Sequence, residues 1–476
     1  MSRLRLLDLV KPFLPILPEV EVPVQKVSYD EKLVWMVVSG LGFYVLNEIP
    51  LYGVKATTSY DPLFWLRPVL ASTRGSVMEL GIGPLVMAGF IVQLLGGAQV
   101  IDVNFDYRSD RQLYQSAQKL LAICLTFGQA LALIFSGIYG SPSELGVGGI
   151  VLLTFQIVVG GLFVIYMDEI LQKGYGYGTG VSFFTVLSVS QMSLWRLFSF
   201  SSETSERGKE LVGAFTGMVH LLWTRRSFKN ALMEAFFRTY LPNMFEFYAT
   251  LGLFALMVYV QGMRIDIPIK STRARTPASS YPIRLLYTGN TGLLFWTALV
   301  SNLVIFSHLL YSQFPDNLFV GLIGSWSVRP GTTNQVVAVS GLAYYLQPPL
   351  SVVQALWDPI KTVVYAAMVV IVCSVFSRSW AEHSGGSARD LAKAFKTQEI
   401  VIVGHRDVSI VRELKKVIPP AASIGGAVLG LLSVATSLVG VYTGTAVVIG
   451  TITVYNYFEI LAQEGGVPGG FVPGAQ

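Results

Sequence analysis

The sequence predicts an all-α protein that spans a membrane about ten times, and two observations support this. First, 52% of the residues are hydrophobic and only 13% are charged, whereas a soluble domain carries about 25% charged residues. Second, the chain has no Asp, Glu, Lys or Arg between Val417 and Phe458, and shorter uncharged runs recur along its length. A spanning helix needs about 20 apolar residues, so these runs are long enough to cross a bilayer.

The uncharged runs predict the spans one by one along the chain. Gly440, Thr443 and Gly444 divide the longest run into a helical hairpin, because glycine readily ends a helix. The predicted spans cover residues 32–52, 77–98, 118–139, 146–167, 179–198, 243–262, 289–311, 361–377, 420–440 and 443–461. An even number of spans places both termini on one side of the membrane.

Two loops with concentrated positive charge predict the orientation. Residues 263–288 and 378–417 follow even-numbered spans, and each loop carries more Lys and Arg than Asp and Glu. Cytosolic loops are enriched in Lys and Arg, so we expect both loops and both termini in the cytosol. The loop from Trp195 to Pro242 conflicts with this rule. It holds seven cations against four acids, yet the span count places it on the other side.

The segment between the first two spans is too polar to cross the membrane and too apolar for an exposed loop. Residues 51–73 contain apolar pieces that are interrupted by charges such as Asp61 and Arg67. Irregular backbone at membrane depth must be buried in protein or line a cavity. This pattern is compatible with two structures, a re-entrant segment or an amphipathic helix on the membrane surface.

The remaining motifs do not predict an enzyme, a metal site or a cofactor. Gly174–Gly180 is glycine-rich like a phosphate-binding loop but lacks the following Lys-Ser/Thr, so we expect a turn that lets helices approach closely. The four histidines are scattered, with no pair at metal-ligand spacing. Few ionisable residues fall inside the spans, whereas coupled transporters keep such residues near the membrane midplane.

A series of short motifs runs in order along nearly the whole chain. They include Leu51-Tyr-Gly53, Asp61-Pro-Leu63, Trp65-Leu-Arg67, Glu79-Leu-Gly81, Lys173-Gly-Tyr-Gly176, Leu241-Pro-Asn-Met-Phe245, Arg329-Pro-Gly-Thr332, Ser340-Gly-Leu-Ala-Tyr-Tyr345, Asp358-Pro-Ile-Lys361 and Glu413-Leu-Lys-Lys416. Together they resemble the SecY family, in particular the pore-forming alpha subunit of the eukaryotic Sec translocon.

The resemblance implies two pseudo-symmetric halves around an hourglass pore with a plug and a lateral gate. The implied domains are residues 1–31 as a cytosolic amphipathic segment, 32–198 as the N-terminal half with spans 1–5, 199–242 as a lumenal hinge loop, 243–463 as the C-terminal half with spans 6–10 and cytosolic loops 263–288 and 378–417, and 464–476 as a cytosolic tail. The plug corresponds to about residues 57–74, which favours the re-entrant structure.

The function implied is a protein-conducting channel of the endoplasmic reticulum, which translocates secretory polypeptides and releases transmembrane segments laterally into lipid. Its pore constriction falls on six residues, Ile82, Val86, Val181, Thr185, Leu294 and Ile449. Short aliphatic side chains can dewet a narrow pore and offer no hydrogen bonds to a passing polypeptide. Thr185 is the one polar member.

The implied lateral gate lies between spans 2–3 and spans 7–8. Its polar contact falls on Gln129 and Asn302, and Met87 stands where we expect a hydroxyl-bearing residue. A hydrogen bond between membrane helices contributes about 0.6 kcal/mol. We therefore expect the gate of this chain to be held closed in a different way.

The resemblance also assigns charges and partners. Asp61, Arg67, Arg74 and Glu382 match the plug and the charges that orient signal sequences, and Arg273, Arg275 and Arg406 match ribosome-binding positions. The implied partners are small single-span beta and gamma subunits, the ribosome, nascent polypeptides with their signal sequences, and post-translational accessory membrane proteins.

Three alternative functions remain open from the sequence. One is a paralogous translocon restricted to co-translational substrates. Another is a secondary transporter, which should show a midplane cavity with convergent polar groups. The third is a membrane scaffold that recruits ribosomes through the same basic loops, in which the constriction residues could be changed freely.

Overall fold

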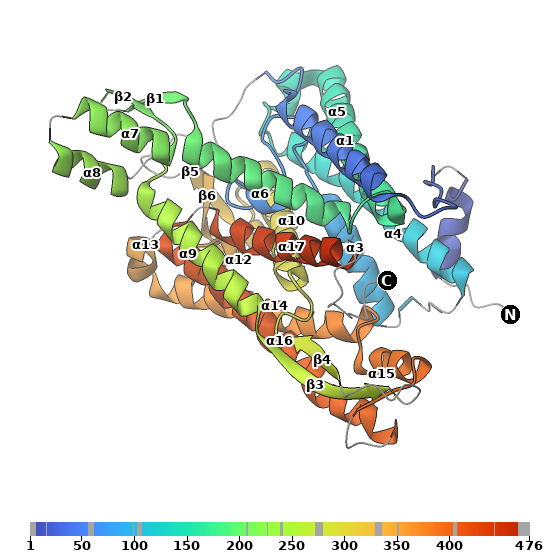
Figure 1. Ribbon diagram of the computed structural model, residues 1–476. Helices are drawn as coiled ribbons and strands as arrows, with labels where there is room; N and C mark the ends of the chain where they lie inside the picture. The colour runs from blue at the N-terminus through green and yellow to red at the C-terminus, as the bar shows by residue number, and fades with distance from the viewer. Residues whose placement is uncertain are drawn as a thin grey trace.

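The computed structural model describes residues 6–15, 17–55, 61–98, 100–101, 107–205, 208–225, 227–238, 241–271, 279–328, 336–349, 352–402, 407–441 and 443–464. Helices dominate this part of the chain, and each predicted span falls on a helix (Figure 1). These helices are α1 (Tyr29–Glu48), α3 (Gly83–Gly97), α4 (Arg108–Phe135), α5 (Pro142–Ile170), α6 (Gly180–Phe198), α9 (Met244–Gln261), α10 (Thr291–Gln313), α14 (Pro359–His383), α16 (Asp407–Val439) and α17 (Gly444–Glu464).

The prediction of a helical protein with many spans is confirmed. Seven helices of the described chain are long and apolar enough to cross a membrane, namely α4, α5, α9, α10, α14, α16 and α17. Helix α3 is apolar but has only 15 residues. The number of ten crossings therefore stays a prediction.

Local sequence signals set several helix ends. Ser28 starts α1 with a capping box, in which its hydroxyl accepts from the Glu31 amide and its own amide donates to the Glu31 carboxylate. Thr179 caps α6, accepting from the Ser182 amide at 3.3 Å. Gly440 has φ +80° after the end of α16, which confirms the predicted helical hairpin.

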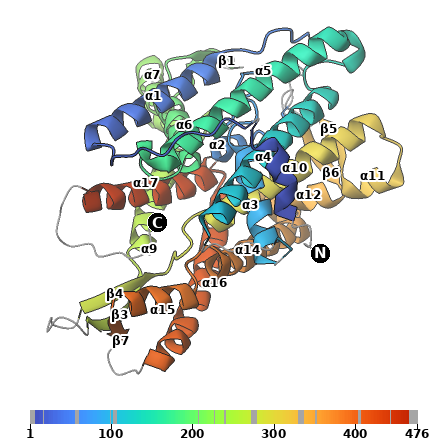
Figure 2. The same ribbon diagram turned by 90° about the vertical axis from the view of Figure 1, so that its right-hand side faces the viewer.

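The spanning helices pack as two groups that follow the chain order. Helices α1 and α3–α6 form the first group, and α9, α10, α14, α16 and α17 form the second. The groups meet along two seams. On one seam α3 and α4 contact α10, and α3 also contacts α14; on the other α6 contacts α17 (Figure 2).

The two predicted basic loops fold together into one body, which we call the basic subdomain. It contains β3 (Arg264–Ser271), β4 (Ser279–Arg284), α15 (Ala388–Thr397) and β7 (Ile400–Ile402), with the antiparallel strand order β4-β3-β7. Ile269, Ile283 and Phe395 form part of its own apolar core. The basic subdomain projects from the end of α9 and the start of α16 (Figure 1).

A second small body lies at the other end of α9, between α6 and α9. It consists of the hairpin of β1 (Ser202–Ser205) and β2 (Gly208–Leu211), followed by α7 (Ala214–Thr224) and α8 (Phe228–Phe236). Arg238 binds it to the start of α9 by donating to the carbonyls of Leu211, Gly213 and Pro242.

The remaining elements are short. The 3₁₀ helix η1 (Leu6–Phe13) packs on α4, and η2 (Leu171–Tyr175) continues α5 as a π turn in which Gly174 has φ +105°. This confirms a turn at the glycine-rich motif. Between α10 and α14 lie α11 (Leu318–Ile323), β5 (Ser325–Val328), β6 (Val336–Ser340), α12 (Leu342–Leu346) and α13 (Val352–Trp357).

The segment between α1 and α3 turns into the interior of the protein. It carries the short helix α2 (Arg67–Leu70), and Leu66, Val69 and Ala71 are at most 1% exposed. Such burial excludes an amphipathic helix on the membrane surface and supports the re-entrant structure. Residues 57–60 of the predicted plug lie outside the described residues.

Candidate functional site

The six predicted constriction residues come from four helices that surround α2. Ile82 directly precedes α3 and Val86 lies in its first turn, Val181 and Thr185 lie on α6, Leu294 on α10 and Ile449 on α17. Ile82, Val86, Leu294 and Ile449 are buried in one apolar cluster, and Val181 packs against it. Helix α2 itself contacts α6, α10 and α17. The structure thus places five of the six in or against the large apolar core that joins both groups of helices, and α2 lies among the helices that carry them.

The hydroxyl of Thr185 does not interrupt this apolar region. It donates to the Val181 carbonyl one turn earlier at 2.8 Å, and the side chain is fully buried. A hydroxyl that bonds to its own helix presents its methyl group to the surroundings. The first turn of α6 is fixed in turn by Asp168, which accepts from the Val181 amide at 3.1 Å.

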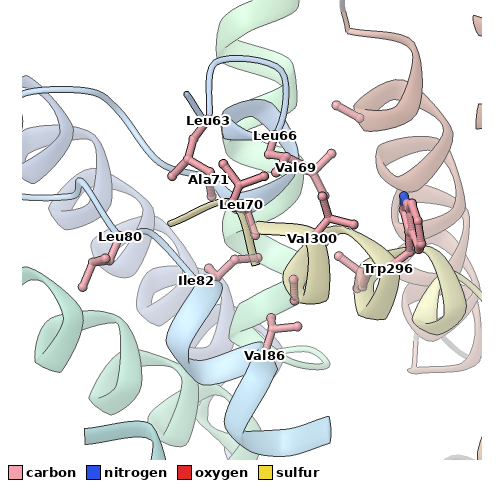
Figure 3. Close-up of a cluster of buried hydrophobic side chains, with 14 of the residues drawn as sticks. Leu63, Leu66, Val69, Leu70, Ala71, Leu80, Ile82, Val86, Trp296 and Val300 are labelled. Atoms are coloured by element: carbon pink, nitrogen blue, oxygen red, sulfur yellow. The ribbon is translucent and has the colours of Figure 1, made fainter. Parts of the chain in front are cut away.

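The segment of α2 closes onto this apolar region. The Leu70 carbonyl accepts from the Ile82 amide at 2.9 Å. Figure 3 shows Leu70 and Ala71 next to Ile82, with Val86 farther along α3 and Val300 of α10 beside them. Gly81 has φ +55°, and a Cβ there would lie 2.1 Å from the Leu70 carbonyl oxygen. Only glycine lets the two chain segments approach this closely.

A buried ion triad holds the ends of the segment together. The Arg67 guanidinium contacts Asp61 at the start of the segment, with one Nη2–Oδ1 distance of 3.0 Å, and reaches Glu79 near its end at 2.7 Å. Glu79 also accepts from the Gly75 amide at 2.6 Å. Burial alone lowers the pKa of Arg67, but the charges of Glu79 and Asp61 outweigh burial and raise that pKa. The arginine therefore stays charged and bridges two carboxylates.

The other charges predicted for signal orientation lie in two separate places. Arg74 is half-buried in the loop that follows α2. Glu382 lies at the end of α14 next to the basic subdomain, 3.5 Å from Arg378 one turn earlier. The structure therefore keeps Glu382 apart from Arg67 and Arg74.

The predicted polar contact of the lateral gate is present. The side-chain nitrogen of Gln129 on α4 donates to the side-chain oxygen of Asn302 on α10 at 2.5 Å. The side-chain nitrogen of Asn302 donates in turn to the Ala298 carbonyl. Met87 is partly buried against the apolar core, and its thioether is at most a weak acceptor. One hydrogen bond therefore joins these two residues across the seam between the two groups.

Four aromatic rings cross the same seam, and sequence reasoning missed them. Phe90 of α3 meets Phe295 of α10 edge-to-face at 5.3 Å, and Phe295 stacks on Phe376 of α14 at 4.0 Å. Trp380, one turn along α14, lies 5.5 Å from Phe90. We call these four residues the aromatic cluster. Their positions in apolar helices looked like ordinary core, and only their common location identifies them.

The three predicted ribosome-binding arginines, Arg273, Arg275 and Arg406, lie outside the described residues. The structure does place their loops, since β3 and β4 flank the first two and β7 precedes the third. In the described part of the chain, no group of three or more His, Cys, Asp or Glu residues could hold a metal ion.

Comparison with known proteins gives the family and its relatives. Residues 76–458 match the family model SecY, and residues 43–75 match the model for the plug domain of Sec61p. The protein transport protein SEC61 subunit alpha of Debaryomyces hansenii is 50% identical over 467 residues, covering 98% of this chain and 97% of that protein. The protein transport protein SEC61 of Saccharomyces cerevisiae is 47% identical over 475 residues, covering 100% and 99%.

Solved structures agree with these relatives. A chain of a protein-conducting channel matches with a TM-score of 0.76 and 29% identity, covering 96% of this chain and 97% of that one. Sec61 in the canine ribosome-channel complex from the endoplasmic reticulum matches with a TM-score of 0.73 and 28% identity over the same shares. The idle yeast Ssh1 complex bound to the 80S ribosome matches with a TM-score of 0.78 and 31% identity, covering 100% of both chains.

Proposed function

The chain belongs to the SecY family, and we propose that it forms a protein-conducting channel of the endoplasmic reticulum membrane. In this function it translocates secretory polypeptides across the membrane and releases transmembrane segments sideways into lipid. Curated relatives of nearly equal length are protein transport proteins, and a similar solved chain is a protein-conducting channel. We assign it no catalytic activity.

The observation that carries this proposal is the apolar region around Ile82, Val86, Val181, Leu294 and Ile449. Its side chains come from both groups of helices, so it lies where the two halves meet. Aliphatic side chains exclude water and ions when they touch, and they do not bind a polypeptide that separates them. Such a constriction suits a channel that must seal at rest and pass many sequences.

The segment with α2 is the plug in this proposal. It contacts three of the constriction helices, and the ion triad of Asp61, Arg67 and Glu79 fastens it. To open the channel, the plug must move away from the constriction, and α3 and α4 must separate from α10 and α14 along their seam. Gln129, Asn302 and the aromatic cluster hold that seam, with Met87 beside it. Arg67, Arg74 and Glu382 would act on the charges that flank a signal sequence.

We propose that both termini and the basic subdomain lie in the cytosol, with the body formed by β1, β2, α7 and α8 in the lumen. Ribosomes would dock through Arg273, Arg275 and Arg406, as the basic composition of these loops suggests. Two of the similar structures are complexes with ribosomes. Small beta and gamma subunits and post-translational accessory proteins complete the proposed assembly.

Site-specific photocrosslinking tests the proposal. A photoreactive residue is placed at Val86 in the constriction, and the control is placed at Phe155, which is 66% exposed on α5 and faces away from the core. Ribosomes stalled on a signal-bearing secretory chain supply the substrate. We expect adducts at Val86 and none at Phe155, and we expect the adducts to disappear when the signal is deleted.

Two other outcomes would replace the proposal. If ribosomes co-sediment with the protein but Val86 never crosslinks, the chain is a docking scaffold. If the reconstituted protein moves small solutes against a gradient and Val86 stays unlabelled, the chain is a secondary transporter. If Val86 crosslinks only to ribosome-bound chains and never to released precursors, the protein is the paralogue restricted to co-translational substrates.

A further inference from the structure

A cavity of about 700 Å³ opens between α14, α15 and α16, and none of the six constriction residues lines it. It lies between the end of α14, the first turn of α15 and the middle of α16. Its lining includes Arg378, Glu382, Arg389, Lys415, Ile418 and Pro419. Of the residues discussed for function above, Glu382 and its partner Arg378 reach it. A cavity of this volume falls in the size range of sites for small organic molecules.

The cavity sits where apolar helix gives way to charged loop. Helix α14 has no charged residue from Thr362 to Ser377, and Arg378 is the next residue. Helix α16 becomes uncharged from Val417 onwards, directly after Lys416. A cavity at these two boundaries lies at the level of the lipid headgroups.

The lining is divided into an apolar floor and a charged rim. Ala381, Ala388 and Ile418 are buried and form the floor. Arg378, Arg389 and Lys415 supply three cations against the single carboxylate of Glu382. The N-terminus of α15 is already capped by Ser387 and has Asp390 in its first turn, so the cations of the rim carry the positive charge. The rim therefore attracts an anion, and the floor accepts apolar groups.

Two of the cations have no partner among the described residues. Among the described residues, neither Arg389 nor Lys415 has an ion pair or a side-chain hydrogen bond, whereas the neighbouring Lys416 pairs with Glu413 at 2.7 Å. Arg378 shares only a 3.5 Å contact with Glu382. The turn before α15 is held in place, because Tyr287 donates to the Gly386 carbonyl at 2.7 Å. Arg389 therefore follows a turn that is held in place, and Lys415 faces the cavity from α16.

We propose that this cavity binds the headgroup of an anionic phospholipid of the cytosolic leaflet, with Arg389 and Lys415 contacting the phosphate. Basic pockets between membrane helices on the cytosolic side recognise such headgroups. The acyl chains continue along the adjacent helix surfaces, where Val375 is 63% exposed one turn before Arg378 and Ile424 is 53% exposed next to the cavity residue Ser423. The bound lipid then bridges α14 and α16.

The test uses the full-length chain, purified with its natural subunits and placed in phosphatidylcholine nanodiscs. The probe is a photoactivatable phosphatidylinositol, and mass spectrometry maps the labelled peptides. The cavity variant carries Arg389→Gln and Lys415→Gln. The matched control carries Lys393→Gln and Lys396→Gln, two exposed residues of α15 that do not line the cavity. Both variants lose two positive charges, the control from α15 alone and the cavity variant from α15 and the adjacent part of α16. Thermal unfolding verifies that both are folded.

We expect labelled peptides to contain the end of α14 and residues 415–423, and we expect about tenfold less labelling in the cavity variant. The control should label like the unmodified chain, and a phosphatidylcholine probe should not label the site. Equal labelling of the cavity variant, or an equal loss in the control, would overturn the proposal. Absence of the lipid label, with the cavity crosslinked to a protein subunit, would overturn it as well. These readouts do not depend on translocation, so they separate this proposal from the channel function.

Discussion

In the proposed channel, the charge of Arg67 holds the plug in place. It is buried between Asp61 and Glu79, and it joins the start of the re-entrant segment to its end. Removing one partner of a buried ion pair costs about 3–5 kcal/mol, since it leaves an uncompensated buried charge. Here two carboxylates would lose their common partner.

We predict that Arg67→Met loosens the plug. A cysteine introduced at Val69, which is 1% exposed, should then react faster with a membrane-impermeant maleimide added from the lumenal side. The control combines Arg67→Met with Asp61→Asn and Glu79→Gln, which removes the uncompensated charges and should restore part of the protection. Unchanged reactivity in Arg67→Met would show that the triad does not hold the plug.

The aromatic cluster gives a second prediction at the scale of residues. Phe295→Ala removes ring contacts to Phe90 and Phe376, and each aromatic pair contributes about 0.5–1.5 kcal/mol beyond its buried area. The closed gate should weaken, so precursors with less apolar signal sequences should be translocated. The measurement is translocation of a reporter series with decreasing numbers of leucines in the signal.

Phe306→Ala is the matched control, because Phe306 lies on the same helix but is 54% exposed. Phe306→Ala should leave unchanged the signal threshold, which is the smallest number of signal leucines that still supports translocation. If Phe295→Ala and Phe306→Ala have the same threshold as the unmodified chain, the aromatic cluster does not hold the gate.

Sequence reasoning predicted single residues unevenly. The resemblance assigned Ile82, Val86, Leu294 and Ile449 to the constriction, and all four are buried in the apolar core; their role stays a prediction. It also placed Gln129 and Asn302, which form their hydrogen bond. Met87 indicated that the gate is held in another way, but nothing in the sequence pointed to Phe90 and Phe376. Aromatic residues occur throughout apolar helices, and only packing brings these rings together.

At the scale of elements, the approach between the plug and the start of α3 depends on Gly81. A Cβ there would meet the carbonyl oxygens of Leu70 and Ala71 at 2.1 and 2.7 Å. These are backbone atoms, so α2 or α3 must move to make room.

We therefore predict that Gly81→Ala displaces the plug and makes the resting channel leak ions. Gly75→Ala is the control, because Gly75 also has a positive φ but its Cβ would meet no atom within 4 Å. Both variants carry the strain of a left-handed backbone, about 1–2 kcal/mol, and only Gly81→Ala adds the clash. Ion conductance of the reconstituted protein is the measurement. Equal conductance in the two variants would contradict the prediction.

Hydropathy located the helices well and their ends poorly. The predicted span 420–440 starts later than its helix, since α16 already begins at Asp407. The predicted span 118–139 likewise starts later than α4, which begins at Arg108. Apolar runs report only the part of a helix inside the bilayer, whereas these helices continue into water with charged residues. The strands β3, β4 and β7 were not predicted at all, because β3 pairs with β7 across more than one hundred residues of sequence.

In the whole molecule, the two helix groups meet along two seams, and the one proposed as the gate has few polar contacts. Among the described residues, the seam of α3 and α4 against α10 and α14 carries two side-chain hydrogen bonds, from Gln129 to Asn302 and from Gln313 to the Phe135 carbonyl, together with the aromatic cluster. Hydropathy does not tell which helices are neighbours, since helix packing depends on the match of side-chain shapes. The two-halves arrangement therefore came from the resemblance alone.

In the proposed function, polypeptides pass through this chain and the seam between α4 and α10 opens for them. The most direct measurement joins the seam reversibly, with Gln129→Cys and Asn302→Cys in a chain whose own Cys124 and Cys373 are replaced. A short reducible crosslinker then ties α4 to α10. We expect crosslinking to abolish translocation of a secretory precursor and reduction to restore it. Complete crosslinking with undiminished translocation would contradict the account, because the path would then lie elsewhere.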